Sequence, residues 1–365
     1  MWLVISAAVL LFAVSGAVYI ICGFHRFSFV RKLGEKRKFL SWLLAAAAAA
    51  VVCGAWAVFN LWTAAVVMIH LFIIWLVCDL IASVIRKLRG KKSERNFAGA
   101  AALVITAVYL AFGWYFAHHI YITNYALHTD KNIGEDVRIV MIADSHLGIT
   151  LDGDGFAEQV ERIRSLEPDI VVIAGDFADD SSKKADIERA CKALSTLEPK
   201  YGVFYTLGNH DLGYYPDSLR DYSPDDLERA LTDNGITFLK DETVPLGEHL
   251  YITGRYDRGN EQRKTASELL DSLDGSRYKL VIDHQPNDYD AEADAGADLV
   301  LSGHTHGGPL IPAGQIGLLI GANDSLYGHT HRKGTDFIVT SGISGWAIPF
   351  KTGTVSEIDV IDITG

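Results

Sequence analysis

Residues 298–308 read Asp-Leu-Val-Leu-Ser-Gly-His-Thr-His-Gly-Gly (DLVLSGHTHGG). The apolar run Leu299–Leu301 is followed within five residues by the pair His304 and His306. A short apolar run that ends near glycine is typical of a buried strand in an α/β sheet. Open α/β sheets bind their ligands at the carboxyl ends of such strands. The stretch therefore predicts an α/β domain with a polar site at one sheet edge.

Four other apolar runs end in the same way. Any one of these motifs alone is common in a solvent-exposed turn. Five strands that each end in Asp, Asn or His at one sheet edge are not explained by the packing of the core alone. Val137–Ala143 leads to Asp144-Ser145-His146, Ile170–Ala174 to Gly175-Asp176, Val203–Leu207 to Gly208-Asn209-His210-Asp211, and Leu280–Ile282 to Asp283-His284. Further strands at 250–253, 337–340 and 355–361, with helices at 156–166, 184–197, 224–234 and 264–273, complete an alternating α/β pattern.

The residue types at these strand ends suit divalent metal ions. Carboxylate, amide oxygen and imidazole together favour Mn, Fe or Zn. Two such ions about 3.5–4 Å apart stabilise the attacking and leaving oxygens of a displacement at phosphorus and lower the pKa of bound water. Cys191 is the single cysteine after residue 120, and the chain has no Cys-x-x-Cys, which excludes a thiolate zinc site.

In this order the five motifs resemble those of the calcineurin-like metallophosphoesterases. Asp-x-His, Gly-Asp, Gly-Asn-His-Asp, a lone His and Gly-His-x-His all occur between about residues 137 and 345. The version GHTHGG, with TSGISGW at 340–346, is most similar to the membrane-associated bacterial branch, which includes YkuE-like and UDP-diacylglucosamine-hydrolase-like enzymes. The resemblance implies a four-layer αββα sandwich and a metal-dependent phosphoesterase, a hydrolase that acts on phosphate ester bonds.

The resemblance also implies a role for each matching residue. His210 would face the substrate and protonate the leaving oxygen or stabilise the developing charge. Asp211 would orient His210 through its second ring nitrogen. A metal-bridging hydroxide would attack phosphorus, so no protein nucleophile would be needed. One metal would be held by Asp144, His146 and His306, the other by Asn209, His284 and His304, and Asp176 would bridge the two.

A second Gly-His-Thr-His occurs at 328–331. No apolar run precedes His329 and His331, so we expect them in a connecting segment away from the metals, either as a rim element or as an accidental repeat. Two positions depart from the related branch: Pro309 stands where Gln is frequent, and Lys351 where Arg is frequent. Lysine keeps the charge but loses bidentate phosphate binding, so the substrates of named relatives do not transfer directly.

Residues 1–120 differ sharply in composition from the rest of the chain. They hold 12 Lys and Arg against three acidic residues, whereas residues 121–365 hold 21 basic and 42 acidic residues. The first part contains four apolar stretches, at 2–22, 40–59, 62–85 and 97–117, and each reaches the roughly 20 residues that span a bilayer. The first stretch is an alternative candidate for a signal peptide, but its positive charges follow it, which favours an uncleaved span. We therefore expect a transmembrane region with four helices at 1–120 and a metallophosphoesterase domain at 121–365.

The basic residues of the first part lie in two loops, 26–38 and 86–95, and the turn at 60–61 has none. Positive loops stay in the cytoplasm, so the catalytic domain of this integral membrane protein should be extracytoplasmic. The acidic composition of the second part argues against nucleic acid as a partner.

We expect a membrane-anchored enzyme that contacts membrane lipid and uses two divalent ions (manganese, iron or zinc). Its substrate would be a phosphate ester or pyrophosphate that is lipid-, envelope- or nucleotide-linked. The alternative is a metal-binding membrane sensor or scaffold with little turnover. The presence of His210 and of every expected ligand argues against the alternative.

Overall fold

The structure is a computed structural model that describes residues 2–90, 95–311 and 313–365. The chain divides into two compact units, Met1–Phe112 and Gly113–Gly365. The division falls within one continuous helix, α5 (Phe97–His118), and the first strand of the second unit begins directly after it at Ile120.

The first unit is helical. Among the described residues, three helical segments are long and apolar enough to cross a membrane, namely Lys38–Val58, Leu61–Arg89 and Phe97–His118. A fourth is formed by α1 and α2 if this pair, bent by 81°, counts as one span. The expected apolar spans are thus present as three or four helices. Residues 91–94 of the second basic loop lie outside the described residues. The elements are α1 (Trp2–His25), α2 (Ser28–Lys36), α3 (Lys38–Gly54), η1 (Ala55–Val58), α4 (Leu61–Arg89) and the first part of α5.

The second unit contains two mixed β-sheets, each of six strands within the described residues. In the first sheet the order is β1-β12-β2-β3-β4-β5, and β2 to β5 are parallel. In the second sheet the order is β10-β11-β9-β8-β7-β6, and β11, β9, β8 and β7 are parallel. The strands are β1 (Ile120–His128), β2 (Val137–Ile142), β3 (Ile170–Ala174), β4 (Gly202–Thr206), β5 (Thr237–Phe238), β6 (Glu242–Leu246), β7 (Leu250–Gly254), β8 (Tyr278–Ile282), β9 (Leu299–Ser302), β10 (Gly328–Arg332), β11 (Thr335–Val339) and β12 (Ser356–Thr364).

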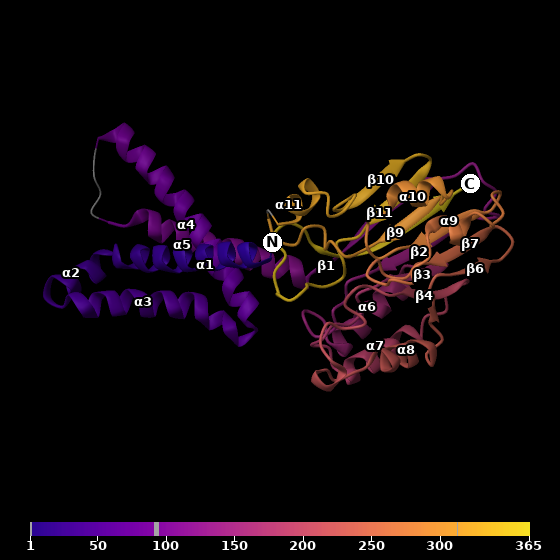
Figure 1. The fold of residues 1–365 in the computed structure, drawn as a ribbon, viewed down its shortest axis with the longest axis horizontal. Coiled ribbons are helices and arrows are strands. Elements are labelled where there is room, and N and C mark those ends of the chain that lie inside the picture. Colours follow the sequence, from indigo (N-terminus) through magenta and orange to yellow (C-terminus); the bar gives the residue numbers. More distant parts are fainter. Residues whose placement is uncertain (1, 91–94, 312) are drawn as a thin grey trace. The chain divides into compact units, whose positions relative to one another are not determined.

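Helices cover the outer face of each sheet (Figure 1). The first sheet is covered by α6 (Gly153–Ser165), α7 (Lys184–Leu194) and α8 (Pro224–Thr232), and the second by α9 (Ala266–Leu270) and α10 (Tyr289–Asp294). Two further short helices, η2 (Asp217–Leu219) and α11 (Ala313–Leu319), lie in loops. The α/β fold class expected from the sequence is therefore confirmed.

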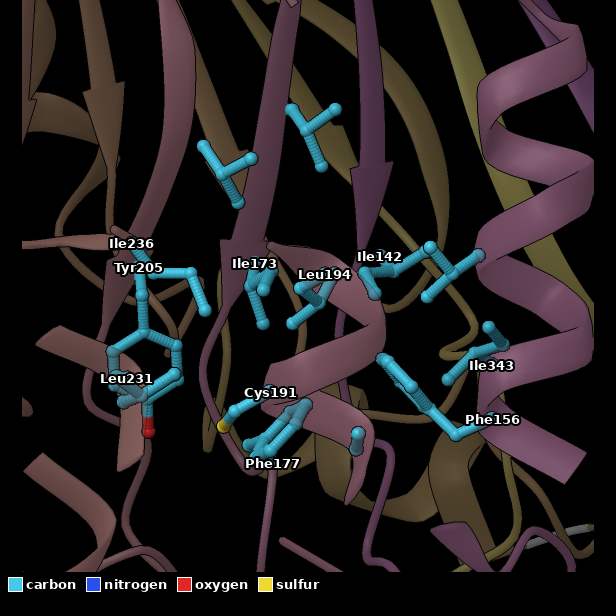
Figure 2. Packing of buried hydrophobic residues seen from close by; sticks show 14 of the residues in the cluster. Ile142, Phe156, Ile173, Phe177, Cys191, Leu194, Tyr205, Leu231, Ile236 and Ile343 are labelled. Atoms are coloured by element: carbon cyan, nitrogen blue, oxygen red, sulfur yellow. The ribbon is translucent and has the colours of Figure 1, made fainter. Parts of the chain in front are cut away.

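Three apolar clusters hold the four layers together. The central cluster joins residues of both sheets, such as Met141 from β2 and Leu280 from β8. The outer cluster of the first sheet packs α6 to α8 on the strands, and Figure 2 shows part of it, including Phe156, Ile173 and Leu194. A third cluster packs α9 and α10 on the second sheet. Because both faces of the central strands are covered, their sequences are continuous apolar runs.

All eight predicted strands are present, but four strands were not predicted: β1, β5, β6 and β10. Each of them is an edge strand or is very short, and polar residues interrupt its apolar pattern. The last strand of the second sheet, β10, is the second Gly-His-Thr-His itself, so the expectation that this motif lies in a connecting segment is wrong. An edge strand that faces solvent needs little apolar surface, so its sequence carries a weak signal.

Candidate metal centre

The residues that follow β2, β3, β4, β8 and β9 meet at one edge of the two sheets. The segments after β2, β3, β8 and β9 contribute two groups, and within each group the potential ligand atoms lie within 4.8 Å of one another. One group consists of Asp144, His146 and His306, and the other of Asp176, His284 and His304. All except His304 are buried. Segments remote in the sequence thus bring two three-residue sets of metal-ligand types together.

Asp176 lies between the two groups. Its Oδ2 is 3.1 Å from Nε2 of His284 and 3.7 Å from Nε2 of His146. Its Oδ1 accepts a hydrogen bond of 2.8 Å from the backbone amide of His210. The attraction of neighbouring histidines outweighs burial and lowers the pKa of Asp176, so this carboxylate is ionised. One ionised carboxylate that reaches a histidine of each group has the geometry of a bridging ligand.

In the first group, two imidazoles point at the same place. Nε2 of His146 is 3.2 Å from Nε2 of His306, which in turn is 3.6 Å from Oδ1 of Asp144. Burial lowers the pKa of His306 well below its usual value, whereas burial raises that of Asp144 to about 6. The nearby carboxylates of Asp176 and Asp179 outweigh burial and raise the pKa of His146. Imidazole nitrogens and a carboxylate oxygen that converge in a buried position are a donor set that fits a divalent cation.

Beside the second group, Oδ1 of Asn209 is a buried acceptor that has no hydrogen-bond partner among the described residues. Nδ1 of His284 donates a 2.7 Å hydrogen bond to the carbonyl oxygen of Ala174, which fixes the ring and turns Nε2 toward Asp176, 3.1 Å away. Buried polar atoms are almost always hydrogen-bonded, so the unpartnered oxygen of Asn209 fits the ligand set of an ion.

The two histidines of the second group have opposite pKa shifts. Burial, together with the nearby His284, lowers the pKa of His304 to about 4, which keeps this imidazole neutral. For His284, burial opposes protonation, but the attraction of Asp176 outweighs it and raises the pKa to about 10. A cation in this position competes with that proton, because a metal ligand must be deprotonated.

The backbone of the site is held in an unusual conformation. Five of the proposed ligands have φ values between 36° and 70°, a region that residues other than glycine rarely adopt. Such conformations cost of order 1–3 kcal/mol each and tend to occur at functional sites. The adjoining Gly208 cannot be replaced freely, because a Cβ atom there would lie 2.2 Å from Oδ1 of Asp176. The five residues are Asp144, His146, Asp176, His304 and His306.

The ring of His210 lies beside the metal-ligand cluster and is only half buried. Its centroid is 5.0 Å from that of His146, 4.9 Å from Tyr214 and 5.6 Å from Trp346. Burial lowers the pKa of His210. Of the two catalytic residues expected from the sequence, this one is placed where it can meet a substrate bound at the cluster.

Asp211 does not have the partner that the sequence-based prediction gave it. Its two carboxylate oxygens accept hydrogen bonds from four backbone amides, and among the described residues no hydrogen bond joins it to the ring of His210. Asp211 is fully buried, and it fixes the two loops that carry Asp176 and Asn209 instead of orienting His210. The four amides are those of Asp176, Phe177, Ala178 and Gly208, at 2.7–3.1 Å.

The sequence analysis missed several residues that support the site. Oδ2 of Asp179 is 3.5 Å from Nδ1 of His146, as expected of a carboxylate that orients a ligating histidine. The hydroxyl of Tyr214 accepts a 2.7 Å hydrogen bond from Nδ2 of Asn209, which turns Oδ1 toward the cluster. Asp179 follows Asp176 by only three residues, so its proximity to the Gly-Asp motif was a usable signal. Nothing in the sequence pattern pointed to Tyr214 as a partner of Asn209.

Two other residue sets lie away from the metal-ligand groups. The second histidine pair, His329 and His331, is exposed on β10, and both rings bond to Oδ1 of Asp336 at 2.8 Å. Lys351 is fully buried, and its Nζ donates to the carbonyl oxygens of Ser341, Gly342 and Val355 at 2.6–3.2 Å. A phosphate-binding role for Lys351, which its alignment with arginine suggested, does not fit this environment.

A cleft of about 780 Å³ adjoins the second group. Its wall includes Asn209 and His304 from the cluster, and Tyr214, Tyr256 and Gln285 from surrounding loops. A substrate phosphate at the cluster therefore has room beside it for the group that it carries.

Comparison with known proteins agrees with this site. The model of the calcineurin-like phosphoesterase family matches residues 137–308, which contain all five motifs. An uncharacterized metallophosphoesterase of Aquifex aeolicus is 31% identical over 251 residues, which cover 67% of this chain and 92% of that relative. The chain belongs to the metallophosphoesterase family.

Other metallophosphoesterases share less of their length with this chain. An uncharacterized metallophosphoesterase of Helicobacter pylori is 29% identical over 281 residues, 73% of this chain and 70% of its own length. A Danio rerio protein described as a transmembrane protein with metallophosphoesterase domain is 27% identical over 61% of this chain and 52% of its own. Membership of the family implies a metal-dependent phosphoester hydrolase with two divalent metals, and the helices of the first unit agree with a membrane protein.

Proposed function

We propose that this metallophosphoesterase is a membrane-anchored, two-metal hydrolase, with a transmembrane region at residues 1–120 and a catalytic domain at 121–365. The observation that carries the proposal is the position of Asp176, whose Oδ2 lies within 3.1 and 3.7 Å of one histidine of each ligand group. A single buried metal site would not need a second set of ligands around the same carboxylate. We infer that Asp144, His146 and His306 hold one ion, that Asn209, His284 and His304 hold the other, and that Asp176 contacts both.

Two bound metal ions would stabilise the charge that develops at phosphorus and would activate a water molecule. The neutral imidazoles of His304 and His306 and the free Oδ1 of Asn209 provide ligand atoms that need little rearrangement. Mn, Fe and Zn all suit this mixture of carboxylate, amide and imidazole. Asp179 and the carbonyl of Ala174 hold the two histidines His146 and His284 in their rotamers.

His210 is the residue that we assign to proton transfer. Its ring is beside the cluster but is not part of either ligand group. Burial lowers its pKa, and the negative charge of a bound phosphate would act in the opposite direction and favour the protonated ring. A protonated His210 can then give this proton to the leaving oxygen. Asp211 supports the reaction indirectly, because it fixes the loops around Asp176 and Gly208.

The membrane anchor favours a substrate that is itself part of the membrane or the envelope. A single residue, His119, separates the end of α5 at His118 from the start of β1 at Ile120, so the catalytic domain is held on a very short tether to this candidate membrane helix. The basic loops at 26–38 and 86–95 favour an extracytoplasmic catalytic domain. We therefore propose a lipid- or nucleotide-linked phosphate ester or pyrophosphate as substrate, as in the YkuE-like and UDP-diacylglucosamine-hydrolase-like branch. The acidic domain makes nucleic acid an unsuitable partner.

The test is hydrolysis of p-nitrophenyl phosphate, bis-p-nitrophenyl phosphate and a panel of phospholipids, isoprenyl phosphates and nucleotide-sugars by the purified full-length protein with Mn. We expect turnover of at least one of them and a loss of about 10²-fold or more in kcat for His210→Ala, with unchanged metal content. His331→Ala serves as the matched control. If the protein binds two metals but hydrolyses no member of the panel, the alternative of a membrane sensor or scaffold is correct.

A further inference from the structure

We propose that residues 311 and 313–320 dock into the lipid surface at the edge of the domain that holds the metal centre. This proposal rests on the membrane anchoring proposed above and goes beyond it, because it assigns a second membrane contact to the catalytic domain itself. No charged residue occurs from Pro309 to Asn323. Five large apolar side chains of this segment are exposed, most of all Leu319 at 85% and Ile320 at 73%; the others are Ile311, Ile316 and Leu318. Contiguous exposed apolar patches mark interaction surfaces.

The segment leaves the fold next to the metal centre. The loop that carries it starts at Pro309, directly after the two glycines of GHTHGG, and returns at Leu326, whose carbonyl oxygen accepts a 2.6 Å hydrogen bond from Oγ1 of Thr305. Gly308 packs against Leu326 and Gly314 so closely that a Cβ atom at Gly308 would touch both. The exposed apolar residues are thus carried by a loop whose base is the loop of His304 and His306.

The same base is tied to the last turns of α5. The backbone amide of Lys351 donates to the carbonyl oxygen of Gly113 at 2.9 Å, and the next amide, that of Thr352, donates to the carbonyl oxygen of Pro309 at 2.7 Å. Trp114 packs edge-on against Phe350, with ring centroids 5.9 Å apart. All these contacts lie within the unit Gly113–Gly365. Two consecutive amides therefore bridge the end of α5 and the start of the apolar segment.

The sheet topology places the end of α5 and the metal centre at one edge. The strand β1 starts at Ile120, is parallel to β12, and β12 is antiparallel to β2. The start of β1 consequently lies at the edge where β2, β3 and β4 end and where the ligand groups follow. Trp114 and Tyr115 in the last turns of α5 are residue types that favour the membrane–water boundary.

The occupant that fits this surface is the bilayer that α5 crosses. A segment that has no charge, exposes leucine and isoleucine, and is hydrogen-bonded through two residues to the end of a candidate membrane helix has the chemistry of a lipid contact. The metal centre then opens beside the lipid surface, which favours the phosphate group of a membrane lipid over a solute from the bulk.

The experiment uses the full-length protein in lipid nanodiscs, after its four cysteines have been replaced by alanine. A single cysteine is introduced by Leu319→Cys, or by Asp130→Cys as control, and carries an environment-sensitive fluorophore. Asp130 is exposed and follows the other end of β1, which is nine residues long and so holds the control about 30 Å from Ile120. We expect doxyl-labelled lipid to quench the label at Leu319 several-fold more than the label at Asp130, and iodide to show the reverse order.

Equal quenching of the two labels by lipid, or full access of iodide to the label at Leu319, overturns the proposal. Leu319 is so exposed that its replacement should not affect folding, and turnover of bis-p-nitrophenyl phosphate by the labelled protein checks this. The same assay separates the two proposals. Activity without lipid quenching at Leu319 overturns only the docking, whereas lipid quenching in a protein that binds metals but hydrolyses nothing supports the docking and contradicts the proposed hydrolase.

Discussion

Asp211 shows how one buried carboxylate can organise a metal centre that it does not reach. Its oxygens accept hydrogen bonds from four amides of the loops after β3 and β4, and these loops carry Asp176 and Asn209. Burial and the nearby Asp176 raise the pKa of Asp211 to about 6, against the effect of the four donors. The carboxylate is ionised at neutral pH, and its negative charge is what holds four positively polarised N–H groups in place.

Asp211→Asn should weaken metal binding without removing a ligand. The amide nitrogen of asparagine faces backbone N–H groups that need an acceptor, so at least one buried donor loses its partner, at a cost of about 1–3 kcal/mol. We expect a lower melting temperature and a metal affinity reduced by about tenfold or more, as is usual when a supporting residue of a metal site is lost. Isothermal titration with Mn measures the affinity.

The matched control for that change is Asp274→Asn. Asp274 also accepts a backbone hydrogen bond, from Ser276, but it is exposed and precedes β8, whose other end leads to His284. Its replacement should leave the Mn affinity close to that of the unchanged protein. An equal loss in both variants would mean that Asp211 has no special role in the geometry of the centre.

For single residues, the sequence predicted the chemistry of the site more accurately than it predicted which groups each side chain contacts. The types and order of the residues after five strands indicated a metal-dependent phosphoesterase, and the family is confirmed. The partner of Asp211 was predicted wrongly, because a pattern shows which residues follow a strand but not which backbone amides a side chain will face. The left-handed backbone of Asp144 and Asp176 has no sequence signal for the same reason, since the surrounding fold imposes it.

The second Gly-His-Thr-His illustrates how an element, and not a motif, decides the chemistry. On the edge strand β10, His329 and His331 project from one face, and both bond to Asp336 on β11. The same four letters after β9 deliver His304 and His306 to the carboxyl edge of the sheet, where the other ligand types are. The prediction that the first pair serves the metals follows from the strand that precedes it.

Replacing both histidines of one pair by alanine separates the two elements. The double variant His329→Ala/His331→Ala should keep the metal content of the unchanged protein, because these rings are exposed and bond to Asp336, away from the two ligand groups. The double variant His304→Ala/His306→Ala should lose most of its bound metal. Elemental analysis by mass spectrometry after gel filtration gives the content of each. A similar loss from the two double variants would refute the assignment.

Lys351 ties the loop before β12 to its neighbours by three hydrogen bonds to carbonyl oxygens. Complete burial lowers its pKa from 10.5 to about 7, although Asp144 and Glu357 act in the opposite direction. Between these two pH values the unfolded chain binds the proton and the folded chain does not, so the free energy of unfolding must rise with pH. The increase in the free energy of unfolding is complete only when the pH exceeds the unfolded-state pKa of 10.5.

We therefore expect the stability of the full-length protein in detergent to increase by about 2–3 kcal/mol between pH 7.5 and pH 9.5 from this group. Thermal denaturation at the two pH values measures the change. In Lys351→Met the titrating group is absent, so the variant should be less stable at high pH, where it lacks the hydrogen bonds, and its dependence on pH should be weaker. A pH dependence as steep as that of the unchanged protein would show that Lys351 is not its source.

For the molecule as a whole, composition separates a basic apolar part from an acidic part more clearly than any motif does. The apolar stretches correspond to the helices of the first unit, but the 81° bend between α1 and α2 was not predicted. Hydropathy counts the apolar residues of a window and does not register the direction of the helix axis. The break at residues 26–27 lies among basic and aromatic residues, which the sequence alone assigns to a loop.

The proposed orientation can be tested in cells that express the full-length protein without its native cysteines. A cysteine introduced by Asp130→Cys should react with a membrane-impermeant maleimide in intact cells. A cysteine introduced by Arg89→Cys, in the second basic loop, should react only after permeabilisation. The positive-inside rule gives this order. Labelling in the opposite order would place the catalytic domain in the cytoplasm and exclude an extracytoplasmic substrate.

The central claim is that two metal ions share Asp176, and a crystal structure of the protein grown with Mn tests it directly. The anomalous difference map should contain two peaks about 3.5–4 Å apart, one next to Asp144, His146 and His306, and one next to Asn209, His284 and His304. One carboxylate oxygen or both oxygens of Asp176 should contact the two ions. A single peak, or two peaks of which only one lies near Asp176, would contradict the account.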